Sequence, residues 1–352
     1  MTVGGSKSFW GYRIGNLMNA YWFSGAAASG KEAGISLRHQ KVFVIHHGAL
    51  GDLVLTFPLF KAIKGAGLEI HLLCQGHLGI LARSLGLVQK AHALESAHFA
   101  SLYKDAPNEK VKDALNVCDV MLAIIRSDIW VSDISRFFKK PIHRIPPQPE
   151  PTSGTHVSSH LLLSCAKTGL IKSFEYMPRK DPATILDLKT ETKKIWIHPG
   201  AGSLKKRWPL SRFIETAALL RAKGWDPAFF LGPAEFSLEP ILKDTAPAFR
   251  IFRTWEVTEL TRLLKTAWAF IGNDSGVSHL AAFLGLATVA IFGPTDPVRW
   301  RPLGPSVAVV QGISDCSPCF ESRFESCPRP LCLDRVTPQQ ILKALFEIGS
   351  NG

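Results

Sequence analysis

Residues 272–279 read Gly-Asn-Asp-Ser-Gly-Val-Ser-His, a polar turn between two segments of different pattern. The apolar run Ala267 to Ile271 predicts a strand, and Val277 to Leu284 predicts a helix. Small residues let a ligand approach the backbone, and the unpaired N–H groups of the helix's first turn carry a partial positive charge. The turn therefore predicts a phosphate site at residues 274–276, although an Asp or Ser N-cap beside a tight turn explains the same residues.

Around this turn, strand and helix patterns alternate through the second half of the chain. The predicted elements are strands at Lys194–His198, Pro227–Leu231 and Ala287–Phe292, helices at Leu210–Lys223, Val257–Thr266 and Pro338–Ile348, and a loop at 293–301. Because the carboxyl ends of parallel strands meet at one edge of a sheet, three of the turns should converge. They would bring a cation, Lys206, and a carboxylate, Glu235, to the predicted phosphate site. This combination indicates a nucleotide-sugar site, although Glu235 could also be ordinary charge at a helix start.

The first half of the chain has the same organisation. Lys41–His46 predicts a buried strand, residues 47–52 a glycine-containing turn, and Leu53–Lys64 a helix. The turn has neither the G-x-G-x-x-G spacing of dinucleotide sites nor the Gly-Lys-Ser/Thr of a P-loop. Further predictions are strands at Glu69–Cys74 and Val117–Ile125, helices at Leu78–Leu85 and Val157–Thr168, and a proline-rich loop at 145–153. The fold class is therefore α/β, with two Rossmann-like parallel-sheet domains and an active site in the cleft between them.

Domain boundaries are predicted from composition. Residues 1–40 form an aromatic, glycine-containing extension, which is either an amphipathic helix on a membrane surface or disordered. Residues 41–175 make the first domain, on the acceptor side. Residues 176–192 make a polar linker, and 193–352 make the nucleotide-sugar-binding domain. No apolar run reaches the roughly 18–20 residues that a transmembrane helix needs.

The formal net charge of +12 is evidence about binding partners rather than about the fold. Nucleic acid, anionic lipid and phosphorylated substrates all fit a basic chain. However, the sequence has no zinc-finger pattern, RNA-binding aromatic signature or Lys/Arg block, so nucleic acid is not an expected partner.

Asp52 is the predicted catalytic residue of the first half. Transfer of a sugar to a hydroxyl group needs a base for the acceptor's proton, and a carboxylate at a helix start stays ionised. A plain N-cap role is the competing interpretation. The chain has no Asp-x-Asp pair, so a metal-bridged diphosphate is not indicated. Four histidines near the same edge are expected to be structural, namely His46, His47, His198 and His279.

The seven cysteines indicate a reducing compartment, because their number is odd and no clear secretion signal precedes them. Cys74, Cys118 and Cys165 lie in apolar runs and are expected to be buried thiols. The remaining four have a zinc-like opening pair, but the second pair is not C-x2-C. A structural thiol loop or a disulfide is the first interpretation, and a metal site the second, for Cys316, Cys319, Cys327 and Cys332.

Five motifs in order resemble the ADP-heptose:lipopolysaccharide heptosyltransferases, glycosyltransferase family 9. The resemblance extends from about Lys41 to Ile348, and it does not include residues 1–40. The motifs are residues 50–58 (LGDLVLTFP), 198–203 with 206–209 (HPGAGS and KRWP), 232–235 (GPAE), 273–280 (NDSGVSHL) and 292–297 (FGPTDP).

The resemblance implies a GT-B fold and inverting, metal-independent transfer of heptose from ADP-heptose to a lipopolysaccharide inner-core acceptor. No cofactor is expected. Asp52 matches the family's general base. The residues implied in donor binding are Lys206 at the phosphates, Glu235 near the ribose or sugar, and Gly202, Ser203, Asp274, Ser275, Gly276 and His279. A cytoplasmic monomer is expected, peripheral on the inner face of the inner membrane, where the acceptor is carried.

Two other functions are compatible with the same pattern. A sugar-nucleotide epimerase or hydrolase could use the same two-domain fold, and it would need no acceptor. A nucleotide-sugar-binding protein without catalysis is the third hypothesis, and the joint presence of Asp52, Lys206 and Glu235 argues against it.

Overall fold

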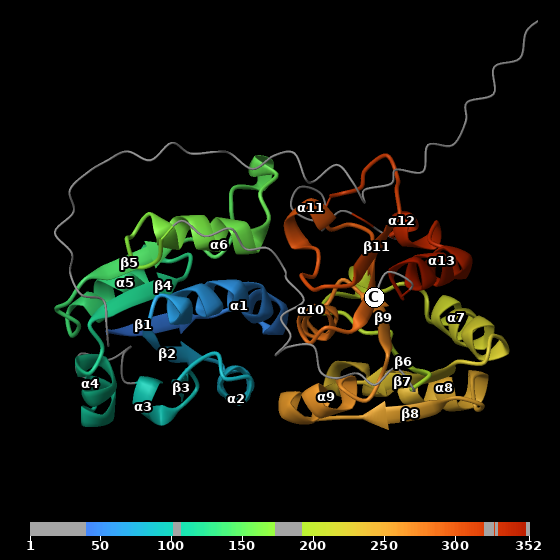
Figure 1. Cartoon of the computed structure of the whole chain (residues 1–352), viewed down its shortest axis with the longest axis horizontal. Helices are drawn as coiled ribbons and strands as arrows, with labels where there is room; N and C mark the ends of the chain where they lie inside the picture. Colours follow the sequence, from blue (N-terminus) through green and yellow to red (C-terminus); the bar gives the residue numbers. More distant parts are fainter. Residues whose placement is uncertain (1–39, 101–106, 173–191, 320–326, 328–329, 350–352) are drawn as a thin grey trace, which may run out of the picture. The chain divides into compact units, whose positions relative to one another are not determined.

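The structure is a computed structural model that describes residues 40–100, 107–172, 192–319, 327 and 330–349 (Figure 1). Residues 37–352 belong to one compact unit, which contains two parallel sheets. Except for Gln40 and Thr192, the predicted extension at 1–40 and linker at 176–192 lie outside the described residues. The domain boundaries therefore stay predictions.

The first sheet has five parallel strands in the order β3-β2-β1-β4-β5. Their bounds are β1 Lys41–His46, β2 Glu69–Cys74, β3 Lys90–Ala93, β4 Val120–Ile124 and β5 Ile142–Ile145. The helices are α1 Leu50–Gly65, α2 Gly76–Ser84, α3 Ala97–Ala100, α4 Glu109–Asn116, α5 Asp128–Ser135 and α6 Val157–Ala166, with a 3-10 turn η2 at Pro151–Ser153. Apolar side chains of α1, α2 and α6 pack on one face of this sheet, and those of α3, α4 and α5 pack on the other.

The second sheet has six parallel strands in the order β11-β10-β9-β6-β7-β8. Their bounds are β6 Lys194–His198, β7 Asp226–Leu231, β8 Arg250–Arg253, β9 Ala269–Asn273, β10 Ala287–Phe292 and β11 Val307–Gln311. The helices are α7 Leu210–Ala222, α8 Glu239–Thr245, α9 Val257–Leu264, α10 Gly276–Phe283, α11 Pro297–Trp300, α12 Leu331–Asp334 and α13 Pro338–Gly349, with 3-10 turns η3 Leu204–Lys206 and η4 Pro233–Leu238. Helices α9 and α10 pack on one face, and α7, α8, α12 and α13 pack on the other.

One hydrophobic core contains residues of both sheets. Within it, α1 contacts α10, and the rings of Phe57 and Phe283 lie 4.9 Å apart at 62°. The helix starts also meet, because a Cβ on Gly276 would lie 2.8 Å from the Gly51 nitrogen. A side chain at residue 276 would therefore push the two helices apart, which explains the glycine at this position. This packing brings Asp52, in the first turn of α1, near the turn that precedes α10.

The α/β class and the two parallel sheets confirm the sequence prediction, and several boundaries were wrong. Helix α1 begins at Leu50 rather than Leu53, because Asp52 belongs to its first turn and accepts the Ala49 N–H (3.0 Å). The predicted loop at 293–301 contains α11, whose N-cap Asp296 accepts the Val298 N–H (2.9 Å). The proline-rich loop at 145–153 contains η2.

Candidate active site

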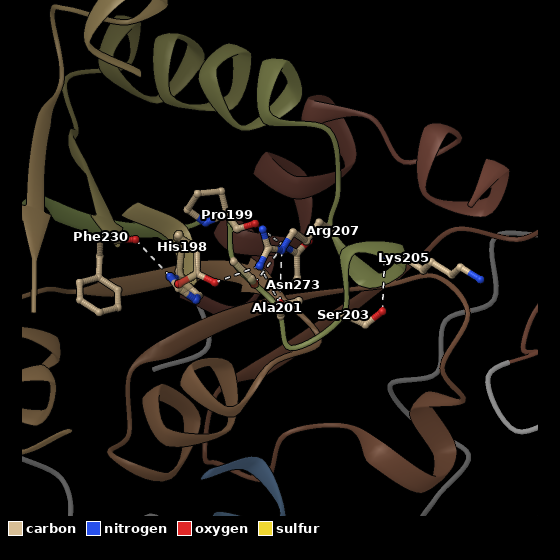
Figure 2. Close-up of polar contacts among 10 residues, drawn as sticks. His198, Pro199, Ala201, Ser203, Lys205, Arg207, Phe230 and Asn273 are labelled. Carbon is tan, nitrogen blue, oxygen red and sulfur yellow. Dashed lines mark hydrogen bonds and ion pairs between the residues drawn. The ribbon is translucent and has the colours of Figure 1, made fainter. Parts of the chain in front are cut away.

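The turn after β6, residues 199–203, is held in shape by side chains of its neighbours (Figure 2). The amide of Asn273, at the end of β9, donates to the carbonyl oxygens of Pro199 (2.9 Å) and Gly200 (3.2 Å) and accepts the Trp208 N–H (2.9 Å). The Arg207 guanidinium donates through Nε and Nη2 to the Ala201 carbonyl oxygen (3.2 and 3.1 Å). Together with Glu235 and Asp274, residues 199–207 and Asn273 form what we name the turn cluster.

Glu235 lies in η4 against this turn, with a buried side chain whose Oε1 accepts from Arg207 Nη2 (3.3 Å). Its pKa is raised chiefly by burial, and the Arg207 charge and the Gly232 backbone partly oppose that shift. A Cβ on Gly200 would lie only 2.3 Å from the Glu235 Cδ. Glycine is required at position 200 because the carboxyl group occupies the space of a side chain.

Lys206 and Asp274 form the second ion pair of the turn cluster, at 2.8 Å between Nζ and Oδ2. Both side chains are largely shielded from solvent, with 17% and 7% of their surfaces exposed. The buried His279 places its Nε2 at 3.9 Å from Asp274 Oδ1. Burial lowers the pKa of His279 to about 4, so the ring is neutral near pH 7.

The predicted phosphate turn forms a helix start, as expected. Ser275 is the N-cap of α10, and its Oγ accepts the Ser278 N–H (3.4 Å). Gly276 packs against Gly51 of α1. Both the capping role and the close backbone approach are therefore present, and anion binding here stays a prediction.

Asp52 lies at the start of α1 within electrostatic range of this cluster. Burial raises its pKa, while the Ala49 N–H, Lys206 and Arg126 lower it and Asp274 raises it. A carboxyl group of the first half thus lies near the Lys206–Asp274 pair of the second half. The sequence placed these three residues at one predicted cleft, and the structure brings them together.

A cavity of about 360 Å³ opens beside Asp52, and we name it the Asp52 cavity. Its volume falls within the range of small-molecule pockets. It lies at the carboxyl ends of β1, β4 and β5, and its described lining residues are His46, His47, Gly48, Asp52, Thr56, Ile124, Ile125, Arg126, Ser127, Trp130, Pro147 and Gln148.

Four other residues that the sequence analysis named, Gly202, Ser203, His198 and His46, make mainly local contacts or none. Gly202 is exposed, and a Cβ there would meet nothing within 4 Å. The Ser203 Oγ accepts the Lys205 N–H (3.3 Å) as a local cap of η3. His198 is buried and donates through Nδ1 to the Phe230 carbonyl oxygen (3.1 Å), a structural role, and burial lowers its pKa to about 4. His46 is likewise buried with a pKa near 4, whereas His47 is exposed.

The cysteines of the described residues do not form a metal-binding group. Cys74, Cys118 and Cys165 are buried thiols, as predicted. Of the last four, Cys319 and Cys332 are buried, Cys316 is exposed and Cys327 is half-buried. Among the described residues no group of three or more His, Cys, Asp or Glu side chains is arranged to hold a metal ion.

Several site residues were missed by sequence reasoning. Arg207 and Asn273 stood in quoted motifs without a role, because a contact to a neighbouring turn is not visible in one sequence. Arg126, Trp130 and Gln148 had no motif at all, since they come from the segment after β4, from α5 and from the segment after β5, and meet only in the fold.

Comparison with known proteins finds similar sequences and similar folds. A model described as glycosyltransferase family 9 (heptosyltransferase) matches residues 155–327. Lipopolysaccharide heptosyltransferase 3 of Escherichia coli is 26% identical over 287 residues, which cover 72% of this chain and 83% of that protein. Two solved structures share the fold. A family 9 glycosyltransferase from Veillonella parvula has a TM-score of 0.70 at 16% identity, covering 91% of this chain and all of that one. The E. coli ADP-heptose lipopolysaccharide heptosyltransferase II has a TM-score of 0.68 at 18% identity, covering 89% of this chain and 99% of that one.

The two parallel-sheet domains share the GT-B-like fold of these solved heptosyltransferase-type structures. These similarities support a glycosyltransferase, and the chain is similar to family 9, the heptosyltransferases.

Proposed function

We propose that the protein transfers a heptose from ADP-heptose to a lipopolysaccharide inner-core acceptor, with inversion at the anomeric carbon and without a metal ion. The observation that supports this proposal best is the proximity of Asp52 to the Lys206–Asp274 pair, beside an open cavity. A base, a phosphate cation and space for an acceptor are the three parts that direct sugar transfer needs.

Asp52 is the general base in this proposal. The acceptor hydroxyl oxygen attacks the anomeric carbon, Asp52 takes the hydroxyl proton, and the carbon–oxygen bond to ADP breaks with both electrons leaving on the diphosphate. Because burial raises the pKa of Asp52, its carboxylate is a stronger base than an exposed aspartate. Attack from the face opposite to the leaving group inverts the configuration in one step.

Lys206 stabilises the negative charge that develops on ADP. In the structure its ammonium group pairs with Asp274, so the donor diphosphate would share or replace that partner. Ser275 and Gly276, at the start of α10, add backbone N–H groups for the phosphates, and Gly202 and Ser203 line the adjoining turn. Glu235 binds the ribose or sugar hydroxyls, while Asp274 and the neutral His279 bind the heptose. This division places phosphate, ribose and sugar at successive turns of the second sheet.

The acceptor side is the first domain, and the protein acts alone on the cytoplasmic face of the inner membrane. The net charge of +12 suits an anionic, membrane-borne acceptor. No helix in the described part of the chain is both long and apolar enough to cross a membrane. The attachment that we propose is a surface contact, for which the predicted extension at 1–40 is a candidate.

The test is transfer from ADP-heptose to a heptose-free inner-core acceptor, with the anomeric configuration of the product determined by NMR. We expect transfer with inversion, and unchanged turnover after addition of EDTA. Thermal unfolding with ADP, UDP, GDP and CMP tests the donor separately. A nucleotide at 100 times its Kd stabilises the native state by about 2.7 kcal/mol. Stabilisation by another nucleotide alone would replace the donor, and conversion of donor without acceptor would favour an epimerase or hydrolase.

A further inference from the structure

The Asp52 cavity contains groups that the proposed chemistry does not use. Asp52 lines it, Arg126 follows β4, Trp130 lies in α5, and Gln148 follows β5. All of these residues come from the first half of the chain, and Asp52 also lies within electrostatic range of Lys206 and Asp274 in the turn cluster. A sugar bound here would present a hydroxyl group to Asp52.

The charges in the cavity favour an anionic guest. Arg126 is exposed, and its Nη2 donates to the neutral amide oxygen of Gln148 (2.5 Å). The nearest acidic residue along the chain, Asp128, pairs with Arg144 instead (2.5 Å). Asp52 is the acidic side chain among the described lining residues. The charge of Arg126 lowers the pKa of Asp52 by a coulombic interaction rather than by a hydrogen bond. The guanidinium therefore keeps donors for an oxyanion, which it can bind with two parallel hydrogen bonds.

The histidines of the cavity contribute no positive charge near neutral pH. His46 is buried, its pKa is lowered to about 4, and its Nδ1 has no hydrogen-bond partner among the described residues. His47 also has a lowered pKa, because of partial burial. Arg126 is accordingly the permanent cation of the described lining.

An aromatic wall completes the cavity. The rings of His47 and Trp130 meet edge to face, with centroids 5.0 Å apart and planes at 85°. Trp130 is half-buried, packed on one side against the core of the first sheet. Pockets for small polar molecules combine such apolar walls with a few directed polar groups. The C–H face of a sugar ring fits this wall, with its polar substituents directed at Arg126 and Asp52.

We propose that Arg126 binds an oxyanion substituent, phosphate or carboxylate, of the acceptor sugar, and that Trp130 packs on the face of that sugar. Arg126 is then a specificity-determining residue that selects acceptors carrying an acidic group and orients their hydroxyl toward Asp52. This inference rests on the proposed function, because it takes the first domain as the acceptor side.

The first experiment compares transfer kinetics of the wild-type protein and Arg126→Gln. Losing a charged hydrogen-bond pair should raise the acceptor KM by about 10- to 100-fold, with the affinity for ADP unchanged. Arg136→Gln is the matched control, since Arg136 pairs with Asp133 on α5 (3.2 Å) and does not belong to the described cavity lining. An unchanged acceptor KM in Arg126→Gln would overturn the proposal. So would an equal loss of ADP affinity, which would assign Arg126 to the donor diphosphate.

Modified acceptors identify the oxyanion. One preparation is treated with phosphatase, and a second has its carboxyl groups reduced to alcohols. The wild-type protein should lose affinity for the preparation that lacks the recognised group, and Arg126→Gln should show no further loss with it. Equal losses in the two proteins for both preparations would contradict recognition by Arg126.

A binding measurement keeps the inference separate from the transfer reaction. Calorimetric titration with glucose 6-phosphate, glucuronate and glucose needs no turnover. The wild-type protein should prefer one of the anionic sugars over glucose, and Arg126→Gln should lose that preference. Absence of any preference in the wild-type protein overturns the subsite, whereas absence of transfer with a retained preference overturns the proposed function alone.

Discussion

The turn cluster of the second sheet and the Asp52 cavity of the first differ in how their polar groups are satisfied. In the turn cluster, Glu235 bonds to Arg207, Lys206 to Asp274, and Asn273 to two carbonyl groups of the neighbouring turn. In the cavity, Arg126 is exposed and the His46 Nδ1 has no hydrogen-bond partner within the described residues. The polar groups of the turn cluster are therefore preorganised by contacts within the protein, whereas the Asp52 cavity keeps polar groups that a ligand can bind.

This difference suggests how the two proposed substrates are selected. Preorganised, buried groups lower the cost of ordering a site, so they suit a small donor of constant structure. An open cavity with one fixed cation suits a larger acceptor, most of which lies outside the protein. Substitutions in the two regions should therefore have different effects. Those in the turn cluster should lower stability and donor affinity, and those in the cavity should change the use of the acceptor or the pH dependence of the reaction.

The largest effect is expected from Asp52→Asn. The amide cannot take the acceptor's proton, so kcat should fall by about 10²- to 10⁴-fold, the usual contribution of a general base. Because the amide keeps the shape and can still accept the Ala49 N–H, affinity for ADP should not change. The measurements are kcat for transfer and the Kd of ADP by calorimetry. Normal turnover in this variant would remove Asp52 from the mechanism and leave its helix-start contact as its whole role.

The second effect is expected from Lys206→Ala. Removing a cation from a leaving group typically costs about 10²- to 10³-fold in kcat. The variant also leaves the Asp274 carboxylate buried without this partner, which should lower the free energy of unfolding by roughly 1–3 kcal/mol.

Lys205→Ala is the neighbouring control, since this side chain points away from Arg207 and Asn273 in Figure 2. Turnover and denaturant midpoint are measured together for both variants. A loss of stability with full kcat in Lys206→Ala would restrict the lysine to a structural ion pair.

The two regions also differ in how far the sequence predicted them. Lys206, Glu235 and Asp274 lie in turns that follow apolar strands, so local pattern and sheet topology were sufficient to predict that they lie close together. Arg126, Trp130 and Gln148 were missed because α5 and the segments after β4 and β5 form the cavity together, and their meeting depends on packing rather than on local sequence.

The same reasoning explains the strands. Every inner strand of both sheets was predicted, because inner parallel strands are buried on both faces and appear as continuous apolar runs. The edge strands β3, β5, β8 and β11 were missed. Strands β3, β5 and β8 have four residues each, are partly exposed and include charged residues such as Lys90, Arg144 and Arg250. An edge position permits such residues, which removes the apolar signal. Strand β11 (VAVVQ) was missed although its residues are mostly apolar.

A third, smaller effect is expected from Gly200→Ala in the turn cluster. The added Cβ would lie 2.3 Å from the Glu235 Cδ, so the carboxyl group and the turn must move apart. Overpacking of this kind costs about 1–3 kcal/mol, and displacement of Glu235 should weaken donor binding.

Gly65→Ala, at the end of α1, is the control for an added methyl group, because a Cβ there meets nothing within 4 Å. The expected result is a lowered melting temperature and a raised Kd for ADP-heptose in Gly200→Ala alone. Equal behaviour of the two variants would show that the Glu235 position does not depend on the space at residue 200.

The smallest effect concerns the pH profile that Asp52 imposes. Burial raises the pKa of Asp52 above the ordinary 3.8, so kcat/KM should fall on the acid side as the carboxylate gains its proton. The groups that act on Asp52 are Lys206, Arg126 and the Ala49 N–H, which favour the ionised form, and Asp274, which opposes it. The neighbouring His46 is neutral above about pH 4.

Removing Arg126 removes one of the charges that lower the pKa. In Arg126→Gln, the acid limb of kcat/KM should therefore move to higher pH, so that relative activity at mildly acidic pH falls further than at pH 8. Arg136→Gln should leave the limb unchanged, since Arg136 is not among the groups that act on Asp52. Full profiles are recorded at saturating ADP-heptose, because this separates protonation of the base from weakened donor binding. A limb that moves to lower pH in Arg126→Gln would mean that another group controls the acid side, and Asp52→Asn, measured at its residual rate, would then retain the same limb.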